Sequence, residues 1–240
     1  TWSSPSPAEV NGKPLIFFCG GNGVVYAFEP IGRASVSASR GSQVATLKKV
    51  WQFDFDPGAP KTNVHKYNTN RREGPSTFYG IPVFHQNRLY VAGGGDIWWG
   101  KNECWLKCID ATKTGDITTN GLVWSYPLQK HVMSTPAVHN GLVFIADCGR
   151  TFHCVDAETG KGLWTHEIKG EAWASPLVAD GKVYLGTQSG NFYVFAASRE
   201  MKVLSELELT TPISATATAA NGVLYISTMT QLFAVRNSAQ

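Results

Sequence analysis

Short runs of apolar residues recur along the chain, and turn-forming dipeptides separate them. Near the middle, Leu142 to Ile145 and Phe152 to Val155 are two such runs, with turn signals at Asn140-Gly141 and Cys148-Gly149. Alternating runs joined by tight glycine turns predict β-hairpins. No run is long enough, or periodic enough at 3.6 residues, to predict a helix. The pattern therefore predicts an all-β chain.

The pattern of runs and turns also repeats. The segment that begins at Ser134 aligns without a gap on the segment that begins at Ala174, so that Gly141 matches Gly181, 40 residues further on. A period of that size is typical of solenoids and propellers. Each unit contains about four predicted strands, and four-stranded units in series predict the blades of a β-propeller.

The repeat extends over the whole chain, which we interpret as one β-propeller domain, residues 1–240. The blades are expected over residues 1–53, 78–125, 132–168, 172–209 and 212–236, and the loop insertions over residues 31–49, 54–77 and 93–103. Natural sheets ordinarily avoid a bare edge, but the fifth unit has only three predicted strands.

We therefore expect the five blades to be part of a larger, seven- or eight-bladed ring. Upstream chain or a partner would supply the missing strand. A five-bladed ring is the alternative. The first residue is Thr1 rather than Met, which fits a processed or truncated product.

Composition narrows the choice of function only slightly. The chain has 240 residues, 43% of them hydrophobic, which is enough to bury a large core. A net charge of +3 is too weakly basic to indicate a nucleic-acid partner. No run of 18 apolar residues is present, so we expect no transmembrane segment. The five cysteines suggest no disulfide framework.

A motif in the third unit carries a family resemblance. Cys154 to Trp164 contains Asp-Ala-Glu-Thr-Gly-Lys followed by Gly-Leu-Trp, and a stretched version runs from Ile109 to Gly115 with its Trp124 delayed. The motif resembles the tryptophan-docking motif of pyrroloquinoline-quinone-type (quinoprotein-like) propeller repeats. The chain is similar to the propeller that assists outer-membrane protein assembly. This resemblance implies a periplasmic or otherwise extracytoplasmic location.

The motif residues also have a plain structural interpretation. Asp156 and Thr159 can cap a tight turn through their side chains, and Gly160 supplies a permissive backbone angle. Trp164 offers a large flat face to pack between blades. We assign these four residues to the scaffold.

The resemblance leaves different classes of function open. Quinone-dependent dehydrogenases of this type commonly have adjacent cysteines and a calcium held by Glu, Asn and Asp. No Cys-Cys pair occurs here, and no motif places calcium ligands. The leading hypothesis is a non-catalytic binding or scaffold propeller without cofactor or metal. The alternatives are a dehydrogenase of alcohols or sugars that uses pyrroloquinoline quinone with calcium, and a carbohydrate-binding propeller.

Several connections between strands are expected on one face of the propeller. In a four-stranded blade, the link to the next blade and the link between the two middle strands emerge on the same side. Residues 54–77 and 93–103 are insertions of these two kinds, and residues 129–133, 147–150 and 166–173 join them. This loop-rich face is the expected binding surface for a protein, a small molecule or a carbohydrate.

The first insertion is rich in basic residues. It contains Lys66, Tyr67, Arg71 and Arg72, and the aromatic residues Phe78 and Tyr79 follow it. Loops of this length are usually functional or disordered. Two interpretations stay open: a solvated loop that covers a neighbouring blade, or a docking surface for an anionic partner.

The second insertion carries Trp98 and Trp99 at a predicted hairpin tip. Leaving one tryptophan bare forgoes about 4 to 6 kcal/mol, so at least one should be covered. Either they pack against the first insertion, or they form a stacking platform for a sugar, a quinone or a peptide. The complete set of candidate binding residues is Trp98, Trp99, His131, Arg150, Trp173, Lys66, Tyr67, Arg71 and Arg72.

Overall fold

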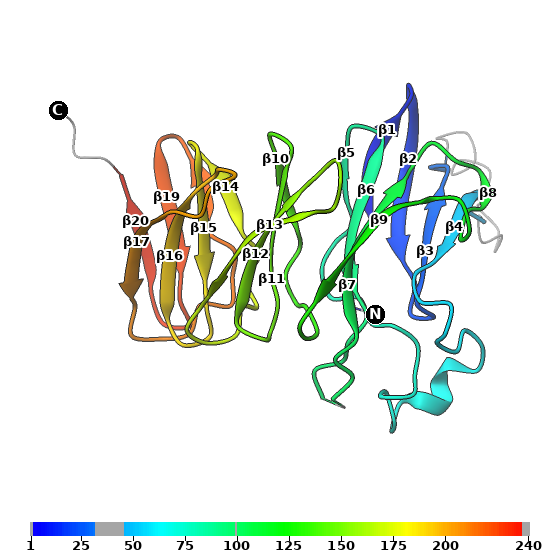
Figure 1. Ribbon diagram of the computed structural model, residues 1–240, viewed down its shortest axis with the longest axis horizontal. Coiled ribbons are helices and arrows are strands. Elements are labelled where there is room, and N and C mark those ends of the chain that lie inside the picture. The colour runs from blue at the N-terminus through cyan, green and yellow to red at the C-terminus, as the bar shows by residue number, and fades with distance from the viewer. Residues whose placement is uncertain (1, 32–45, 99, 237–240) are drawn as a thin grey trace, which may run out of the picture.

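The computed structural model describes residues 2–31, 46–98 and 100–236, and its regular structure is almost entirely β. Five sheets follow one another in chain order and stand in a row, the first at the right of Figure 1 and the fifth at its left. The chain is therefore an all-β propeller of about five blades. Most of the predicted insertion at residues 31–49 lies outside the described residues.

Each sheet is built on an antiparallel meander of three or four strands. The first contains β1 (Ser6–Val10), β2 (Lys13–Cys19), β3 (Val24–Phe28) and β4 (Lys49–Asp54), and the second β5 (Val83–His85), β6 (Arg88–Gly93), β7 (Cys104–Asp110) and β9 (Leu122–Leu128). The third contains β10 (Ala137–His139), β11 (Leu142–Ala146), β12 (Thr151–Asp156) and β13 (Gly162–Glu167). The fourth contains β14 (Leu177–Ala179), β15 (Lys182–Gly186), β16 (Asn191–Ala196) and β17 (Val203–Glu208), and the fifth β18 (Thr218–Ala220), β19 (Val223–Ser227) and β20 (Leu232–Val235).

The hairpin between the first two strands of a sheet explains the recurring Asn-Gly pairs. Asn140 has φ 47° and Gly141 has φ 74°. Two successive residues with positive φ are typical of the two-residue turn that matches the right-handed twist of its strands. Asparagine and glycine are the residues that accept this backbone conformation most readily.

The hydrophobic core lies between neighbouring sheets. The largest cluster combines Phe17 and Phe53 of the first sheet with Leu89 and Ile109 of the second, and all four side chains are buried. Each sheet therefore depends on its neighbours for most of its apolar burial, as expected of stacked repeats.

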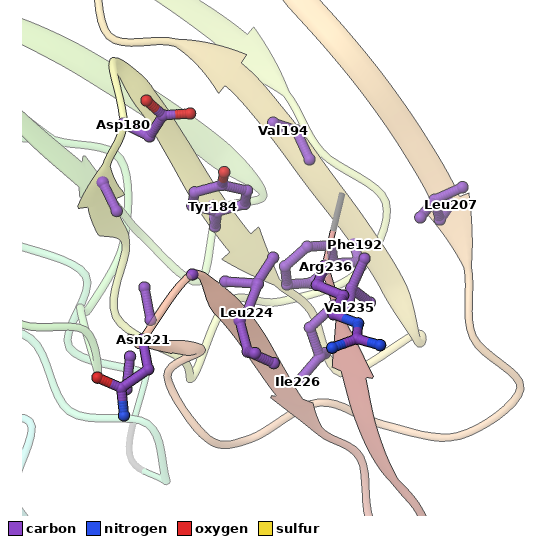
Figure 2. A pocket seen from close by; sticks show the side chains of 15 residues that line it. Asp180, Tyr184, Phe192, Val194, Leu207, Asn221, Leu224, Ile226, Val235 and Arg236 are labelled. Atoms are coloured by element: carbon purple, nitrogen blue, oxygen red, sulfur yellow. The ribbon is translucent and has the colours of Figure 1, made fainter. Parts of the chain in front are cut away.

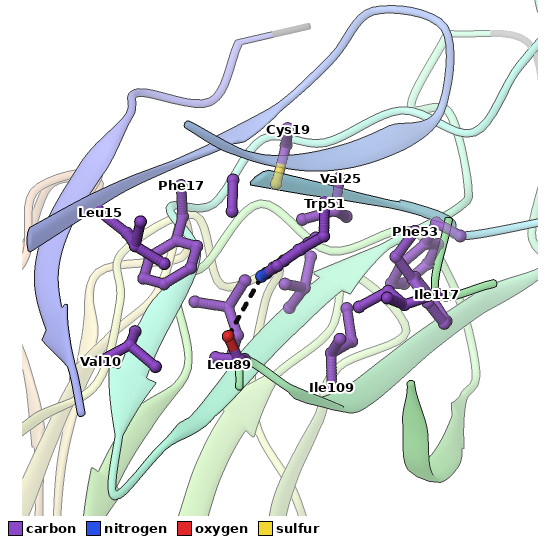
Figure 3. Close-up of a cluster of buried hydrophobic side chains, with 14 of the residues drawn as sticks. Val10, Leu15, Phe17, Cys19, Val25, Trp51, Phe53, Leu89, Ile109 and Ile117 are labelled. Carbon is purple, nitrogen blue, oxygen red and sulfur yellow. Dashed lines mark hydrogen bonds between the residues drawn. The ribbon is translucent and has the colours of Figure 1, made fainter. Parts of the chain in front are cut away.

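Three docking tryptophans, Trp51, Trp124 and Trp164, join successive sheets. Each lies on the last strand of the antiparallel meander of its sheet, next to a register shift, and pairs with Ala27, Cys108 or Cys154 of the neighbouring strand. Each donates its indole N–H to a backbone carbonyl of the following sheet: Ala111 at 3.2 Å, Ala157 at 3.0 Å and Ser198 at 3.0 Å. Figure 3 shows Trp51 and its hydrogen bond inside the first cluster.

Two elements were not predicted. β8 (Gly115–Asp116) leaves the second unit and pairs in parallel with β4, where Trp51 stands opposite Gly115. A 3₁₀ helix, η1 (Val64–Tyr67), lies within the first insertion. Both elements are shorter than the window in which apolar periodicity can be detected.

The row of sheets is open. The first and fifth sheets stand at its opposite ends (Figure 1), and the fifth has three strands in the described part of the chain, as expected. Met229, which precedes its outer strand, and Leu232, the first residue of that strand, are exposed. None of the helical structure among the described residues is long and apolar enough to cross a membrane.

Candidate binding face

The two insertions lie together on one face of the row of sheets. The described residues of 54–77 and 93–103, all except residue 99, lie below the first two sheets in Figure 1, and the connections that follow β9 and β13 emerge on the same face. Backbone bonds between Thr77 and Gly94, 3.0 and 3.1 Å long, tie the insertions to each other. The loop-rich face is thus arranged as the strand order predicts.

Glycines allow the second insertion to pack closely against the sheets. At Gly94, with φ 128°, a Cβ atom would lie 2.3 Å from the carbonyl oxygen of Glu103. At Gly95, it would lie 2.8 Å from the Cβ of His131. Residues with a side chain do not fit at either position, so these glycines bring the insertion down onto the connection after β9.

A buried carboxylate joins the two insertions. The side chain of Asp96 is fully buried, its Oδ2 lies 3.5 Å from Arg71 Nη1 and 3.5 Å from the Tyr79 hydroxyl, and its Oδ1 accepts the backbone N–H of Trp98 at 3.0 Å. Burial, followed by the negative charge of Asp96, raises the pKa of Tyr79, so that its hydroxyl remains a donor. Buried charges are stable only when they are paired in this way.

A second buried charge is also paired. Lys101 is buried, and its Nζ donates to the Gly74 carbonyl at 3.0 Å and lies 3.6 Å from Asp56 Oδ2. The ionisable groups at the base of the two insertions therefore hold the loops together. Asp96 and Lys101 are thus buried at the base of the insertions, whereas Trp98 is exposed.

Four side chains on this face lie together, and we call them the Trp98 cluster: Trp2, Trp98, Arg71 and Tyr79. The rings of Trp2 and Trp98 lie 6.1 Å apart, and the guanidinium of Arg71 lies 5.4 Å from the ring of Trp98. Trp98 is still 58% exposed and Trp2 63%. Trp99 lies outside the described residues.

A cavity of about 340 Å³ lies beside this cluster. Its lining includes Trp2, His65, Tyr67 and Arg71, so both the N-terminal segment and the first insertion contribute. A cavity of this size lies at the lower end of the range found for small-ligand pockets. Trp2, which precedes the first predicted blade strand, had not been recognised as a candidate. Its neighbours are distant in the sequence, and no local pattern marks it.

The remaining candidates are distributed along the face. Lys66 and Arg72 are exposed on the first insertion, and Arg150 is exposed at a turn where its φ is 65°. Trp173 precedes the fourth sheet, is partly exposed, and donates its N–H to Glu171 Oε2 at 3.2 Å. Arg71 is the basic candidate for which a contact with Trp98 is observed.

Three residues that the binding-surface interpretation places on the exposed face are buried. Phe78 and Tyr79 lie beneath the insertions, so they cannot form an exposed surface beside the basic groups. His131 is 7% exposed because the second insertion packs over it. Its Nε2 has no hydrogen-bond partner among the described residues, and burial lowers its pKa, so the ring is neutral at pH 7.

A buried polar network had not been recognised in the sequence. Asp147 accepts the backbone N–H groups of Gln129 at 2.9 Å and Gly149 at 2.8 Å, and lies 3.1 Å from His153 Nε2. His153 Nδ1 lies 3.1 Å from the hydroxyl of Tyr126 on β9. The network fixes the turn at residues 147–150 against the second sheet. Its members are too far apart in the sequence to form a motif.

The docking motif forms the turn after β12. Asp156 Oδ1 accepts the backbone N–H and the hydroxyl of Thr159, both at 2.9 Å, and Arg199 Nη2 lies 2.8 Å from its Oδ2. The backbone bond of Thr159, then Arg199 and the Thr159 hydroxyl, lower the pKa of Asp156 to about 2. Gly160 has φ 72°, and a Cβ there would lie 2.6 Å from the ring of Trp124. The turn thus forms part of the surface that receives the tryptophan of the preceding sheet.

Metal-binding groups do not converge in the part of the chain that the structure describes. No three or more His, Cys, Asp and Glu side chains are grouped there so as to hold an ion. The five cysteines are unpaired and buried, and burial raises the pKa of each thiol to about 12.

Two curated proteins show partial similarity to the chain. Over 96 residues it is 30% identical to the 1-butanol dehydrogenase (cytochrome c) of Thauera butanivorans, covering 35% of this chain and 14% of that protein. Over 108 residues it is 26% identical to the quinohemoprotein alcohol dehydrogenase of Comamonas testosteroni, covering 40% of this chain and 15% of that protein. The chain thus spans about a seventh of the length of these relatives.

Solved structures share the fold at low sequence identity. The crystal structure of BamB from Moraxella catarrhalis matches 93% of this chain and 55% of that chain, with a TM-score of 0.61 and 14% identity. The computationally designed Ika8 protein matches with a TM-score of 0.58 and 11% identity, over 89% of this chain and 52% of that one. At family level, residues 105–236 match the family described as outer membrane protein assembly factor BamB. Because this match covers more than half of the chain, the chain belongs to that family of pyrroloquinoline-quinone-type propeller repeats.

Proposed function

We propose that this chain is a non-catalytic binding or scaffold propeller that recognises a protein partner through the Trp98 cluster. The observation that supports it most strongly is the exposure of Trp98 and Trp2 on a platform that Arg71 holds in place. Binding surfaces are enriched in tryptophan and arginine, and a few such residues supply most of the binding energy. The paired charges beneath the cluster give it a fixed position.

The free energy available at this cluster is substantial. A tryptophan side chain buries about 150 to 250 Å² when fully covered. With 58% of Trp98 exposed, a partner that covers the ring gains about 2 to 4 kcal/mol at roughly 25 cal/mol per Å². This is the magnitude of a single interfacial hot spot.

The expected partner is an extended protein segment with acidic and aromatic residues. Lys66 and Arg72 lie exposed on the same insertion and carry positive charge, and complementary charge favours an acidic partner. The family name refers to outer membrane protein assembly, which suits a protein partner and an extracytoplasmic, periplasmic location.

One observation supports a second candidate function. Both curated relatives are alcohol dehydrogenases by name, and one is named a quinohemoprotein. A dehydrogenase that uses pyrroloquinoline quinone with calcium is therefore the alternative. Among the described residues, no cluster of three or more His, Cys, Asp and Glu side chains marks a metal site, so this alternative has no assigned metal ligands. A carbohydrate-binding propeller is a further alternative, since exposed tryptophans also stack on sugars.

Calorimetric titration of three probes separates these candidates. The probes are a synthetic peptide that alternates acidic and aromatic residues, a maltooligosaccharide, and pyrroloquinoline quinone with calcium. We expect saturable binding of the peptide, and Trp98→Ala should weaken it about thirtyfold, the equivalent of about 2 kcal/mol. Leu204→Ala, an exposed apolar site on the outermost strand of the fourth sheet, is the matched control and should leave binding unchanged.

The other probes provide the contrary outcomes. Saturable binding of the quinone with calcium, together with reduction of an artificial electron acceptor by 1-butanol, would support the dehydrogenase. Binding of the oligosaccharide, lost in Trp98→Ala, would support the carbohydrate-binding propeller. Peptide binding that is insensitive to Trp98→Ala would remove the cluster from the proposal.

A further inference from the structure

The docking tryptophans define one equivalent position in the first three sheets. In each case the tryptophan packs on an aromatic ring of the second strand of its own sheet: Phe17 for Trp51, Tyr90 for Trp124 and Phe144 for Trp164. The centroid separations are 5.7, 5.9 and 6.0 Å. The aromatic partner and the indole together fill the space between two sheets.

The fourth sheet does not have this tryptophan. The strand pairing places Trp164 opposite Cys154 and, at the equivalent point, Ser205 opposite Val194. Each pair lies beside the register shift of its sheet. Ser205 therefore replaces an indole with a hydroxymethyl group, although the aromatic partner at the equivalent position, Tyr184 opposite Val194, is retained.

A groove of about 510 Å³ lies between the fourth and fifth sheets, and its lining includes Tyr184 and Val194, which pair in line with Ser205. Its walls include Tyr184, Phe192 and Val194 of the fourth sheet and Leu224 and Val235 of the fifth. Figure 2 shows Tyr184 and Phe192 facing Leu224 and Val235 across it. The groove is mainly apolar, and Asp180, Asn221 and Arg236 supply polar groups at its margin.

The walls match those that surround Trp164. Phe144, Phe152 and Phe195 lie 5.7 to 6.0 Å from that indole, ring centroid to ring centroid. The pairing partners make Tyr184 equivalent to Phe144, and Val235 equivalent to Phe195. Phe192 follows Phe152 at the 40-residue period. The groove therefore has the surroundings of an indole site, and no described side chain occupies the indole position.

We propose that this groove binds a small bicyclic aromatic molecule of the indole class, in the place that a tryptophan occupies between the preceding sheets. An apolar cavity of about 150 Å³ left by removal of one side chain binds benzene in another protein, so a preformed aromatic space of this kind can take a free ligand. The groove volume is sufficient for a bicyclic ring. The site is separate from the loop-rich face and does not depend on the function proposed for it.

Fluorine NMR of 5-fluoroindole with the full chain tests the proposal. We expect saturable broadening of the ligand signal, and competition by unlabelled indole. Ser205→Trp restores the missing side chain and should abolish the broadening. Ser125→Trp is the control: it adds the same side chain at an exposed position on the outermost strand of the second sheet, and the broadening should be unchanged. A fluorinated cyclohexane of similar size should bind about tenfold more weakly, because it lacks the aromatic face.

Two results would overturn the proposal. One is the absence of saturable broadening at millimolar protein, and the other is broadening that survives in a folded Ser205→Trp variant. A second variant covers the case in which Ser205→Trp does not fold. Leu224→Gln makes the groove wall polar, and it should weaken 5-fluoroindole binding about tenfold. Unchanged affinity in that variant would place the ligand elsewhere.

Discussion

Replacing Trp51 with alanine tests whether the docking tryptophans hold neighbouring sheets together. Trp51 is fully buried, packs on Phe17, and donates its indole N–H to the Ala111 carbonyl of the second sheet at 3.2 Å. Full burial of a tryptophan corresponds to about 4 to 6 kcal/mol, and measured costs of tryptophan-to-alanine changes in cores are about 3 to 5 kcal/mol. We expect Trp51→Ala to lower the free energy of unfolding by about 4 kcal/mol.

The loss should also be local. In stacked repeats, stability is a sum over nearest-neighbour interfaces. Hydrogen exchange should therefore accelerate most in β1 to β4 and in β7, and least in β14 to β17. Urea unfolding gives the total loss, and amide exchange read by mass spectrometry gives its distribution.

Two comparison variants separate packing from hydrogen bonding. Trp51→Phe keeps most of the apolar area and loses the hydrogen bond, so about 1 to 2 kcal/mol of the loss should remain. Trp2→Ala removes a tryptophan that is 63% exposed, and it should change stability by less than about 1 kcal/mol. A loss below about 1 kcal/mol for Trp51→Ala, or exchange that accelerates evenly across all sheets, would refute the reasoning.

Three further predictions concern the turn after β12 and the thiols. Gly160→Ala should cost more than about 2 kcal/mol in urea unfolding because the new Cβ meets the Trp124 ring, whereas Gly141→Ala, with positive φ but open space, should cost about 1 kcal/mol. The pKa of Asp156, about 2, lies below its ordinary value, so its contribution to stability is present above about pH 4 and lost as the pH falls towards 2. The melting temperature of Asp156→Asn, measured against pH, should therefore fall less between pH 4 and 2 than that of the wild type. The same pH dependence in both proteins would contradict this. All five thiols should resist a maleimide at pH 8 in the folded protein and react fully in denaturant, because burial raises each pKa to about 12.

Much of the fold could be predicted because its signals are local. The Asn140-Gly141 pair fixes a hairpin turn through backbone angles alone, and the alternation from Leu142 to Ile145 fixes a strand. The 40-residue period then extends these signals to the neighbouring units. The parallel strand β8 could not be predicted in this way, because its partner β4 lies about 60 residues earlier and two residues carry no period.

The candidate site was predictable only in outline. Strand order placed the two insertions on one face, and the structure has them there (Figure 1). Burial within that face depends on contacts between distant segments, which no local pattern reports. His131 is covered because Gly94 and Gly95 allow the second insertion to pack over it, and Trp2 reaches Trp98 across almost 100 residues of sequence. Whether these residues bind a partner stays a prediction.

The strand β8 has a consequence for how this chain can change in evolution. A propeller whose blades are self-contained can gain or lose a blade by duplication or deletion of one repeat. Here the edge strand of the first sheet is encoded within the second repeat, where Ile117 donates its backbone N–H to Gln52 at 2.9 Å. Deleting the second repeat would also expose the outer edge of the first. The first two blades therefore have to be inherited together.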